Sequence, residues 1–298
     1  MNALALPPDF EARVLRNEPM TKHTSWHVGG PADLFFTPRD ASELSEFLAQ
    51  LDRAVPVMWI GLGSNLLVRD GGIRGAVIDT HGVFDELERI DDTNVWCGAG
   101  VACAKLAKQC IKWGLGPAEF FAGIPGTLGG ALAMNAGAFG GETWNHVVRV
   151  ATLDRAGVRH ERDKSEYTTG YRHVAGPANE WFLGAQLRFE QRPGVSAEDI
   201  RALLARRKAT QPIGEWSCGS VFTNPPGDHA ARLIDAAGLK GTRIGGARVS
   251  EMHANFIVND GSASAADIEQ LIRRVQQVVE QQHGVKLQTE VRIVGEGL

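Results

Sequence analysis

Apolar and polar residues follow one another along the N-terminal third of the chain in a strand, helix, strand order. Residues 33–38 (DLFFTP) predict a short strand, and residues 56–61 (PVMWIG) predict a buried one. Between them, residues 40–53 predict a helix that Asp40 caps at its N-terminus. Four apolar residues fall on one face of that helix, Leu44, Phe47, Leu48 and Leu51. The pattern therefore predicts a first unit of the βαβ kind.

Further short strands follow, with one more helix among them. Strands are predicted at 66–68, 76–80, 95–102, 146–154 and 182–190, with DGGIRG as a break between the first two. Residues 105–114 predict a helix that Gly114 ends, and the polar residues 157–164 resemble a hairpin. Up to about residue 190, the chain is predicted to be α+β.

The pattern changes at residues 192–199, which predict a linker and a helix start with Ser196 as N-cap. That helix is expected to reach Pro212. Two more helices and two strands complete a C-terminal α/β module: helices at 230–238 and 263–284, strands at 253–259 and 288–295.

Length and composition narrow the class of protein. A chain of 298 residues suggests about two domains. With a net charge of −4 and basic residues scattered among acidic ones, it has no charge pattern for nucleic acid. It has neither a run of about 18 apolar residues nor a secretion signal, so we expect a cytoplasmic protein without a membrane span. The four cysteines form no C-x-x-C pair, which predicts reduced thiols and no metal site.

Glycine is unusually frequent, with 35 residues, and it concentrates between Gly61 and Gly75 and between Gly114 and Gly141. In GLGSN (61–65), a strand leads into a glycine turn, but neither the helix of a Rossmann fingerprint nor the Gly-Lys-Ser/Thr of a P-loop follows. Glycine-rich turns let phosphate approach the main chain. Two such loops favour a long, pyrophosphate-bridged dinucleotide held without a Rossmann helix.

Several segments closely resemble UDP-N-acetylenolpyruvoylglucosamine reductases, and they occur in the order expected for that family. They are HTSWHVGGPA (23–32), GLGSNLLV (61–68), GIPGTLGGALAMNAGAFGGE (123–142), GYR (170–172), GSVFTNP (219–225), AGLKGTRIGGARVSEMHANFIVN (237–259) and TEVRIVG (289–295). The uninterrupted passage from GSVFTNP to HANFIVN resembles the shorter class of the family.

The resemblance implies an α+β FAD-binding fold of the vanillyl-alcohol-oxidase/PCMH type, made of two subdomains, followed by a C-terminal α/β substrate-binding domain. The implied boundaries are 1–80, 81–195 and 196–298. The residues implied to bind FAD are Gly61, Gly63, Ser64, Asn65, Leu66, Gly123, Ile124, Pro125, Gly126, Thr127, Gly129, Gly130, Asn135, Gly137 and Ala138. Neither loop contains His or Cys, so we expect the flavin to be bound non-covalently.

The implied reaction is the NADPH-dependent reduction of UDP-N-acetylglucosamine enolpyruvate to UDP-N-acetylmuramate in peptidoglycan precursor synthesis. Hydride passes from flavin N5 to C3 of the enolpyruvyl group, and C2 takes a proton. By resemblance, Arg172 polarises the substrate carboxylate, Glu290 shares a hydrogen bond with it, and Ser220 gives the proton. These three residues would meet only in a cleft between domains.

Four residues are implied to contact the substrate: Tyr171, Asn224, Lys240 and Asn255. The sequence departs from the family at Thr223, where many members have lysine. Charge neutralisation would then fall to Arg172, Lys240, Arg243 or Arg248.

Two other functions remain open at this point. The first is an FAD-dependent oxidase of the same fold that uses O₂, against which the C-terminal domain argues. The second is a flavin- or nucleotide-binding protein without turnover, which only Thr223 supports. The partners expected are the sugar nucleotide and NADPH, and the chain is expected to be a monomer.

Overall fold

In the computed structural model, which describes residue 6 and residues 8–298, the helix predicted at 40–53 forms as α1 (Ala41–Gln50). Asp40 caps it, because its side chain accepts a hydrogen bond of 2.9 Å from the main-chain N–H of Glu43. The apolar face is buried, with Leu44 and Phe47 fully enclosed. Local sequence therefore determines both where this helix begins and which side faces inward.

The chain divides into two compact units, each made of three separate segments of the sequence, and we describe them separately. Unit 1 comprises Met1–Leu15, Leu34–Leu62 and Gly75–Arg206, and unit 2 comprises Arg16–Asp33, Gly63–Arg74 and Arg207–Leu298. Four elements have residues in both units: β1 (Leu15–Pro19), β2 (Pro31–Phe36), β5 (Ile73–Asp79) and α4 (Ala197–Thr210). The predicted division into 1–80, 81–195 and 196–298 stays a prediction.

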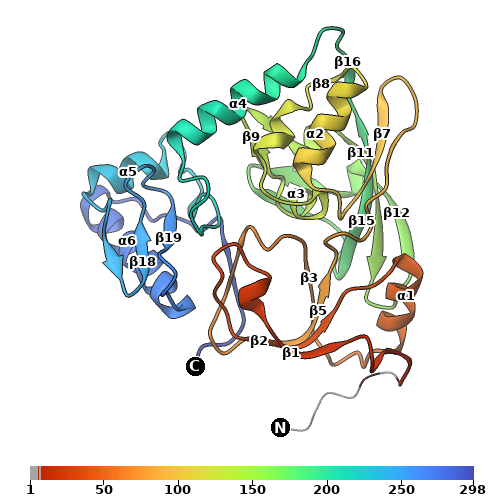
Figure 1. Cartoon of the computed structure of the whole chain (residues 1–298), viewed down its shortest axis with the longest axis horizontal. Coiled ribbons are helices and arrows are strands. Elements are labelled where there is room, and N and C mark those ends of the chain that lie inside the picture. The colour runs from red at the N-terminus through yellow and green to blue at the C-terminus, as the bar shows by residue number, and fades with distance from the viewer. Residues whose placement is uncertain (1–5, 7) are drawn as a thin grey trace. The chain divides into compact units, whose positions relative to one another are not determined.

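Unit 1 is built around an antiparallel sheet in the order β12-β11-β15-β7-β6 (Figure 1). A parallel pair, β3 (Val57–Ile60) with β5 (Ile73–Asp79), also belongs to it, although β5 begins inside the predicted break. The sheet strands and remaining short strands of the unit are β6 (Leu87–Arg89), β7 (Asn94–Gly98), β8 (Leu115–Gly116), β9 (Gly137–Ala138), β10 (Gly141–Glu142), β11 (Val147–Asp154), β12 (Arg159–Asp163), β13 (Thr168–Gly170), β14 (His173–Ala175), β15 (Glu180–Arg188) and β16 (Glu190–Gln191).

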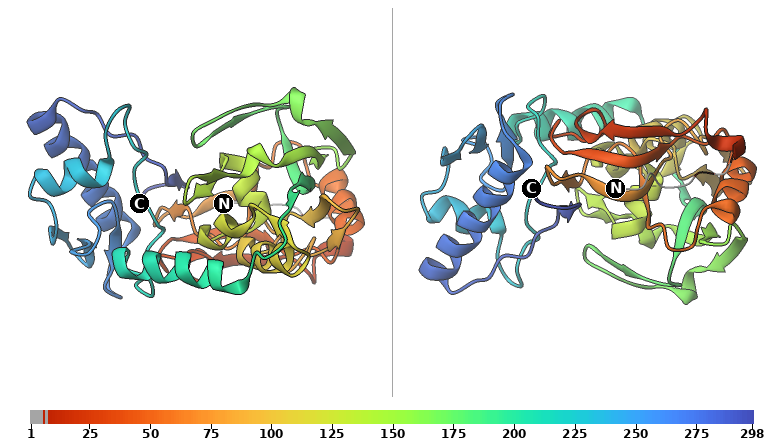
Figure 2. Two further views of the ribbon diagram at one scale, coloured as in Figure 1. Left: turned by 90° about the horizontal axis from the view of Figure 1, so that it is seen from above. Right: turned by 90° about the horizontal axis from the view of Figure 1, so that it is seen from below.

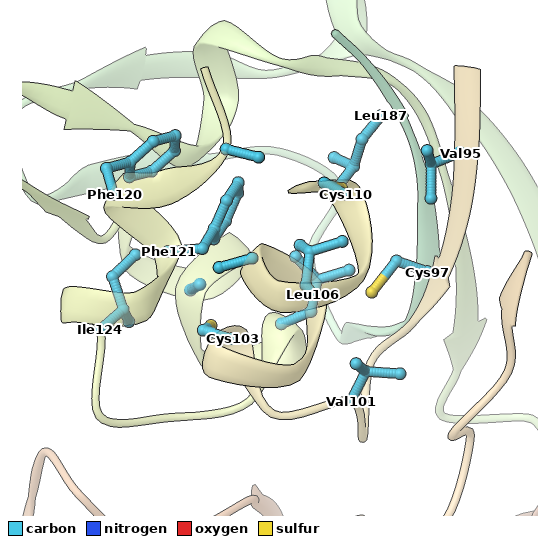
Figure 3. Packing of buried hydrophobic residues seen from close by; sticks show 14 of the residues in the cluster. Val95, Cys97, Val101, Cys103, Leu106, Cys110, Phe120, Phe121, Ile124 and Leu187 are labelled. Carbon is cyan, nitrogen blue, oxygen red and sulfur yellow. The ribbon is translucent and has the colours of Figure 1, made fainter. Parts of the chain in front are cut away.

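Two apolar clusters hold unit 1 together. One packs α1 against β5 and the inner face of β11, and the other encloses α2 (Cys103–Lys112) and the 3-10 helix η3 (Glu119–Gly123). In the second cluster, Phe121 and Leu106 lie close to Cys97 and Leu187 of the sheet (Figure 3). This packing fixes the segment that leads into the second glycine cluster.

That second cluster contains a helix that the sequence pattern does not predict, α3 (Leu128–Met134). Glycine disfavours helix, and α3 contains both Gly129 and Gly130. Main-chain hydrogen bonds from Leu128 and Gly129 to the carbonyl oxygens of Val101 and Ala99 hold it in place, and it packs on β15 and β7. Tertiary contacts therefore override local propensity here.

Unit 2 has a small antiparallel sheet, β17-β18-β19, against which α6 (Ala265–His283) packs through β17 and β18 (Figure 2). The helix predicted at 263–284 forms as α6; Ser264 caps its N-terminus, and Gly284 ends it in the left-handed conformation. A parallel pair, β4 (Leu66–Val68) with β20 (Arg292–Val294), lies beside α6. The other elements of the unit are α5 (Ala230–Ala236), β17 (Arg243–Ile244), β18 (Ala247–Val249) and β19 (Ile257–Asn259).

The two C-terminal strands are shorter than predicted. Only 257–259 of the segment 253–259 is strand, because a turn closes where the N–H of Phe256 donates to the carbonyl oxygen of His253. Only 292–294 of 288–295 is strand, so Glu290 precedes β20 instead of lying on it. The strands β17 and β18 are additions that the pattern does not predict.

All four cysteines are buried free thiols. No helix in the described part of the chain has the length and hydropathy needed to cross a membrane.

Candidate active site

The first glycine loop runs from β3 to β4, and a strand does follow it, as the sequence predicts. Its glycines are there because larger residues do not fit. A Cβ on Gly63, which has a φ of +59°, would overlap the carbonyl oxygen of His23 in unit 2. A Cβ on Gly61 would lie 2.5 Å from Oγ1 of Thr127 in unit 1.

The contact between Gly61 and Thr127 joins the two predicted cofactor loops within unit 1. Thr127 is 1% exposed and is the N-cap residue of α3. Its main chain also bridges to Ala102, in the segment that follows β7. The start of the first loop and the start of α3 therefore lie side by side in unit 1.

Gly130 of α3 differs from these glycines, because no atom of residue 6 or residues 8–298 outside its own helix lies within 4 Å of the position its Cβ would take. A glycine inside a helix costs about 1 kcal/mol relative to alanine. The protein itself does not require glycine at this exposed position, whereas the neighbouring Gly129 packs against Ala99. A helical turn without a side chain lets a flat or bulky cofactor come close to the main chain.

Arg172 lies in a tight turn of unit 1. Tyr171 and Arg172 are the two residues between β13 and β14, where Gly170 pairs with His173. Arg172 has a φ of 53°, a conformation that costs an L-residue about 1 kcal/mol. Its guanidinium lies over the ring of Tyr171 at 5.1 Å, and the Tyr171 side chain is 49% exposed.

The turn is attached to the second glycine cluster. Nη2 of Arg172 donates to the carbonyl oxygen of Gly137 at 3.0 Å, and Nη1 donates to that of Asn135 at 3.4 Å. Asn135 is 2% exposed and ends α3 with a φ of 49°. Its Nδ2 donates to the carbonyl oxygen of Gly170 and to Oε2 of Glu142, and its Oδ1 accepts from the N–H of Trp144.

Ser220 and Glu290 are held close in unit 2 through the main chain of Val221. The carbonyl oxygen of Val221 accepts hydrogen bonds from the N–H of Glu290 at 2.8 Å and of Val291 at 3.3 Å. Asn65 of the first loop donates from Nδ2 to the carbonyl oxygen of Glu290 at 3.1 Å. One backbone frame in unit 2 therefore carries Ser220, Glu290 and Asn65.

The expected substrate residues have partners within unit 2. Oδ1 of Asn224 accepts from the N–H of Ala230 at the start of α5, and Asn255 binds Phe222 through its side-chain amide. Lys240 forms an ion pair of 2.9 Å with Asp235.

Thr223, which stands where many family members have lysine, also has a hydrogen-bond partner in unit 2. Thr223 donates from Oγ1 to the carbonyl oxygen of Gln288 at 3.4 Å. Arg243 and Arg248, two of the cations expected to compensate for the lysine, each pair with a carboxylate, Asp260 and Glu215 respectively.

Unit 1 thus brings together Gly61, Thr127, Asn135, Gly137 and Arg172, and unit 2 brings together Asn65, Ser220, Asn255 and Glu290. The meeting of Arg172 with Ser220 and Glu290 stays a prediction.

The sequence pattern did not select Glu142 or Cys218, although their side chains bind Asn135 and Leu66 of the two predicted cofactor loops. Cys218 donates from Sγ to the carbonyl oxygen of Leu66 at 3.4 Å, and burial raises the pKa of its thiol to about 12. The sequence offered one hint for each residue: Cys218 directly precedes GSVF, and Glu142 ends the second glycine cluster.

Comparisons with known proteins cover almost the whole chain. The FAD binding domain family matches residues 32–161, and the UDP-N-acetylenolpyruvoylglucosamine reductase C-terminal domain family matches residues 211–294. The chain is 58% identical to the UDP-N-acetylenolpyruvoylglucosamine reductase of Alkalilimnicola ehrlichii over 94% of both chains. It is 56% identical to that of Methylococcus capsulatus, over 95% of this chain and 93% of the relative.

A solved structure agrees. The crystal structure of UDP-N-acetylenolpyruvylglucosamine reductase from Thermus caldophilus superimposes with a TM-score of 0.81 at 34% identity, over 94% of this chain and 98% of the other. The predicted fold class, an FAD-binding domain followed by the reductase C-terminal domain, is confirmed. The chain belongs to the UDP-N-acetylenolpyruvoylglucosamine reductase family.

Proposed function

We propose that this chain reduces UDP-N-acetylglucosamine enolpyruvate to UDP-N-acetylmuramate with NADPH and FAD, a step of peptidoglycan precursor synthesis. The observation that carries the proposal is that the family matches extend over both an FAD binding domain and the reductase C-terminal domain. The chemistry requires both parts, since one domain must hold the flavin and the other must hold the sugar nucleotide.

The residues of the two glycine loops fit FAD. Gly130 leaves a turn of α3 without a side chain, so that a flat ring system can approach its main chain. The first glycine loop offers the main-chain N–H groups of a glycine turn, which suit a phosphate. FAD, when bound, supplies the two-electron relay between NADPH and the substrate. We propose that it is held without a covalent bond by the loop residues named from the sequence, with Asn135 supporting them from within.

Arg172 is proposed to bind the carboxylate of the enolpyruvyl group. A guanidinium offers permanently charged, paired donors, and negative charge grows on this carboxylate as C3 takes up a hydride. The turn at Gly170–His173 leaves the Tyr171 ring exposed beside the guanidinium, so Tyr171 is proposed to contact the substrate as well.

Ser220 is proposed to give the proton to C2, and Glu290 to share a hydrogen bond with the substrate carboxylate as charge develops on it. A serine hydroxyl is a weak acid, so this role needs a strongly basic C2 and fixed geometry. The backbone frame through Val221 supports both assignments, because it sets the separation of the two residues within unit 2.

Asn224 and Lys240 are proposed to contact the sugar nucleotide, and Asn255 is considered below. Lys240 would exchange its partner Asp235 for a phosphate or carboxylate of the substrate. We further propose that the chain acts as a monomer in the cytoplasm, with domains at 1–80, 81–195 and 196–298.

An anaerobic absorbance spectrum tests the proposed function. We expect purified protein to show oxidised flavin bands near ~450 nm, to lose them with NADPH, and to regain them only with the sugar nucleotide. A colourless protein that takes up no FAD would contradict the proposal. Reoxidation by air alone would indicate the oxidase.

A further inference from the structure

Asn255 makes three hydrogen bonds to the two residues that directly follow Ser220. Its side chain is 4% exposed. Oδ1 accepts from the N–H of Phe222 at 2.9 Å, Nδ2 donates to the carbonyl oxygen of Phe222 at 2.8 Å, and its own carbonyl oxygen accepts from the N–H of Val221 at 2.8 Å. The side chain thus pairs with the main chain as a strand would.

The opposite edge of the same segment is also bonded. Val221 accepts from Glu290 and Val291, and Phe222 pairs with Thr289 in an isolated bridge. Residues 221–222 are therefore bonded on both edges, and their backbone has little freedom to shift.

Gly219 completes the arrangement on the N-terminal side of Ser220. It has a φ of 72°, which lets the chain turn sharply just before the serine. Ser220 thus stands between a glycine turn and a backbone segment that Asn255 holds, so the position of its Cα depends on Asn255.

The turn that carries Asn255 is itself ordered by the half-buried imidazole of His253. The N–H of Asn255 donates to Nδ1 of His253 at 3.3 Å, and burial lowers the pKa of His253, so that the ring is neutral and can accept this bond at pH 7.

We propose that Asn255 is a positioning residue that sets the place of Ser220 for proton transfer, in place of the substrate contact expected from the family resemblance. This inference rests on the proposed role of Ser220 as the proton donor. Because a weak acid transfers a proton efficiently only at short range and correct angle, a small displacement of the hydroxyl slows that step strongly.

The test compares Asn255→Ala with Asn259→Ala in the FAD-loaded protein. Asn259 is 6% exposed in the same segment, and its amide binds Trp26, Gly261 and Ala263 instead of the residues beside Ser220. Both substitutions leave buried main-chain groups unpaired, so both are expected to lower the melting temperature to a similar extent.

We expect Asn255→Ala to slow reoxidation of reduced flavin by saturating substrate at least tenfold, with a larger solvent deuterium isotope effect on that step. Flavin reduction by NADPH and the dissociation constant of the sugar nucleotide should stay within about twofold. Asn259→Ala should leave both half-reactions unchanged.

Three results would overturn the inference. Equal effects of the two substitutions on reoxidation would make Asn255 merely structural. A raised dissociation constant with an unchanged limiting rate would make it a substrate ligand. If Asn255→Ala does not fold, Asn255→Asp keeps the acceptor for Phe222 and lacks the donor, and a normal reoxidation rate in that variant would equally refute the inference.

Ser220→Ala, measured alongside, separates the two proposals. If Ser220→Ala slows reoxidation and the Asn255 variants do not, only the positioning role fails. If Ser220→Ala has no effect, the proposed function of Ser220 fails.

Discussion

Nδ2 of Asn135 donates a hydrogen bond of 2.9 Å to the carbonyl oxygen of Gly170, two residues before Arg172 in the chain. Arg172 returns the connection by donating to the carbonyl oxygens of Asn135 and Gly137. The segment proposed to hold the flavin and the cation proposed to bind the substrate are therefore fixed to each other within unit 1. Both Asn135 and Arg172 adopt positive φ to achieve this.

Arg172→Gly separates the conformational cost of the positive φ at residue 172 from the contribution of the guanidinium to the reaction. Glycine adopts the φ of 53° without strain, which offsets the loss of two hydrogen bonds, so the free energy of unfolding should change by less than about 1 kcal/mol. Reoxidation of reduced flavin by substrate should fall about a hundredfold or more, because the charged donors are lost. Chemical denaturation and stopped-flow absorbance measure the two effects.

Asn179→Gly is the control, because Asn179 is an exposed residue of unit 1 with a φ of 57°. It should be neutral or slightly stabilising and should not change either half-reaction. Normal reoxidation in Arg172→Gly would show that the arginine is not part of the chemistry.

Ser220→Ala should leave flavin reduction by NADPH near normal and slow reoxidation by the sugar nucleotide by about 10²–10⁴-fold, the range of general acid catalysis. Anaerobic stopped-flow experiments with each substrate in turn give both rates. Ser217→Ala, three residues earlier in the chain, is the control. An equal loss in both half-reactions would point to damaged flavin binding and away from proton donation.

Gly130→Ala should have opposite effects on the free protein and on the complex. Since alanine favours helix and the Cβ position is open, the FAD-free protein should gain about 1 kcal/mol of stability or less. The dissociation constant of FAD, measured by fluorescence titration, should rise at least tenfold, because the new methyl group occupies the surface that FAD approaches. Gly297→Ala, also at an open position, should leave FAD affinity unchanged.

The ion pair between Arg69 and Glu269 predicts a pH dependence of stability. Hydrogen bonds from Arg69 lower the pKa of Glu269 below its ordinary value of 4.5. Partial burial acts in the opposite direction, and a hydrogen bond from Arg273 lowers the pKa further. A lowered folded-state pKa contributes stability that is present above pH 4.5 and disappears as the pH falls through the folded value. The pair is partly exposed, so we expect about 1 kcal/mol.

Denaturation of wild type and Glu269→Gln at several pH values measures this contribution. The stability advantage of wild type at pH 7 should shrink below pH 4.5. For Glu280→Gln, at an exposed position on the same helix, the free energy of unfolding should change with pH as it does in wild type. A constant difference between wild type and Glu269→Gln down to pH 3 would contradict the assignment.

Local signals predicted the elements that local interactions determine. The cap at Asp40 and the apolar spacing of its helix sufficed for α1, and the helix predicted at 263–284 forms as α6. The sequence did not predict α3, because Gly129 and Gly130 disfavour helix and the stabilising partners lie about 30 residues earlier, in the segment after β7.

The candidate site shows the same distinction. Motifs and family resemblance selected Asn135 and Asn255, but their hydrogen-bond partners, Gly170 and Phe222, lie more than 30 residues away in the chain. Whether a polar side chain faces a ligand or the protein's own backbone depends on such distant pairings. No pattern of neighbouring residues carries that information.

The buried thiols have a practical consequence for labelling. Burial raises the pKa of Cys103, Cys110 and Cys218 to about 12 each and raises that of Cys97 well above its ordinary value. Maleimides react with accessible thiolates, so the folded protein should be almost inert to them. A single cysteine introduced on the surface would then accept a fluorophore selectively, with all four native thiols left in place.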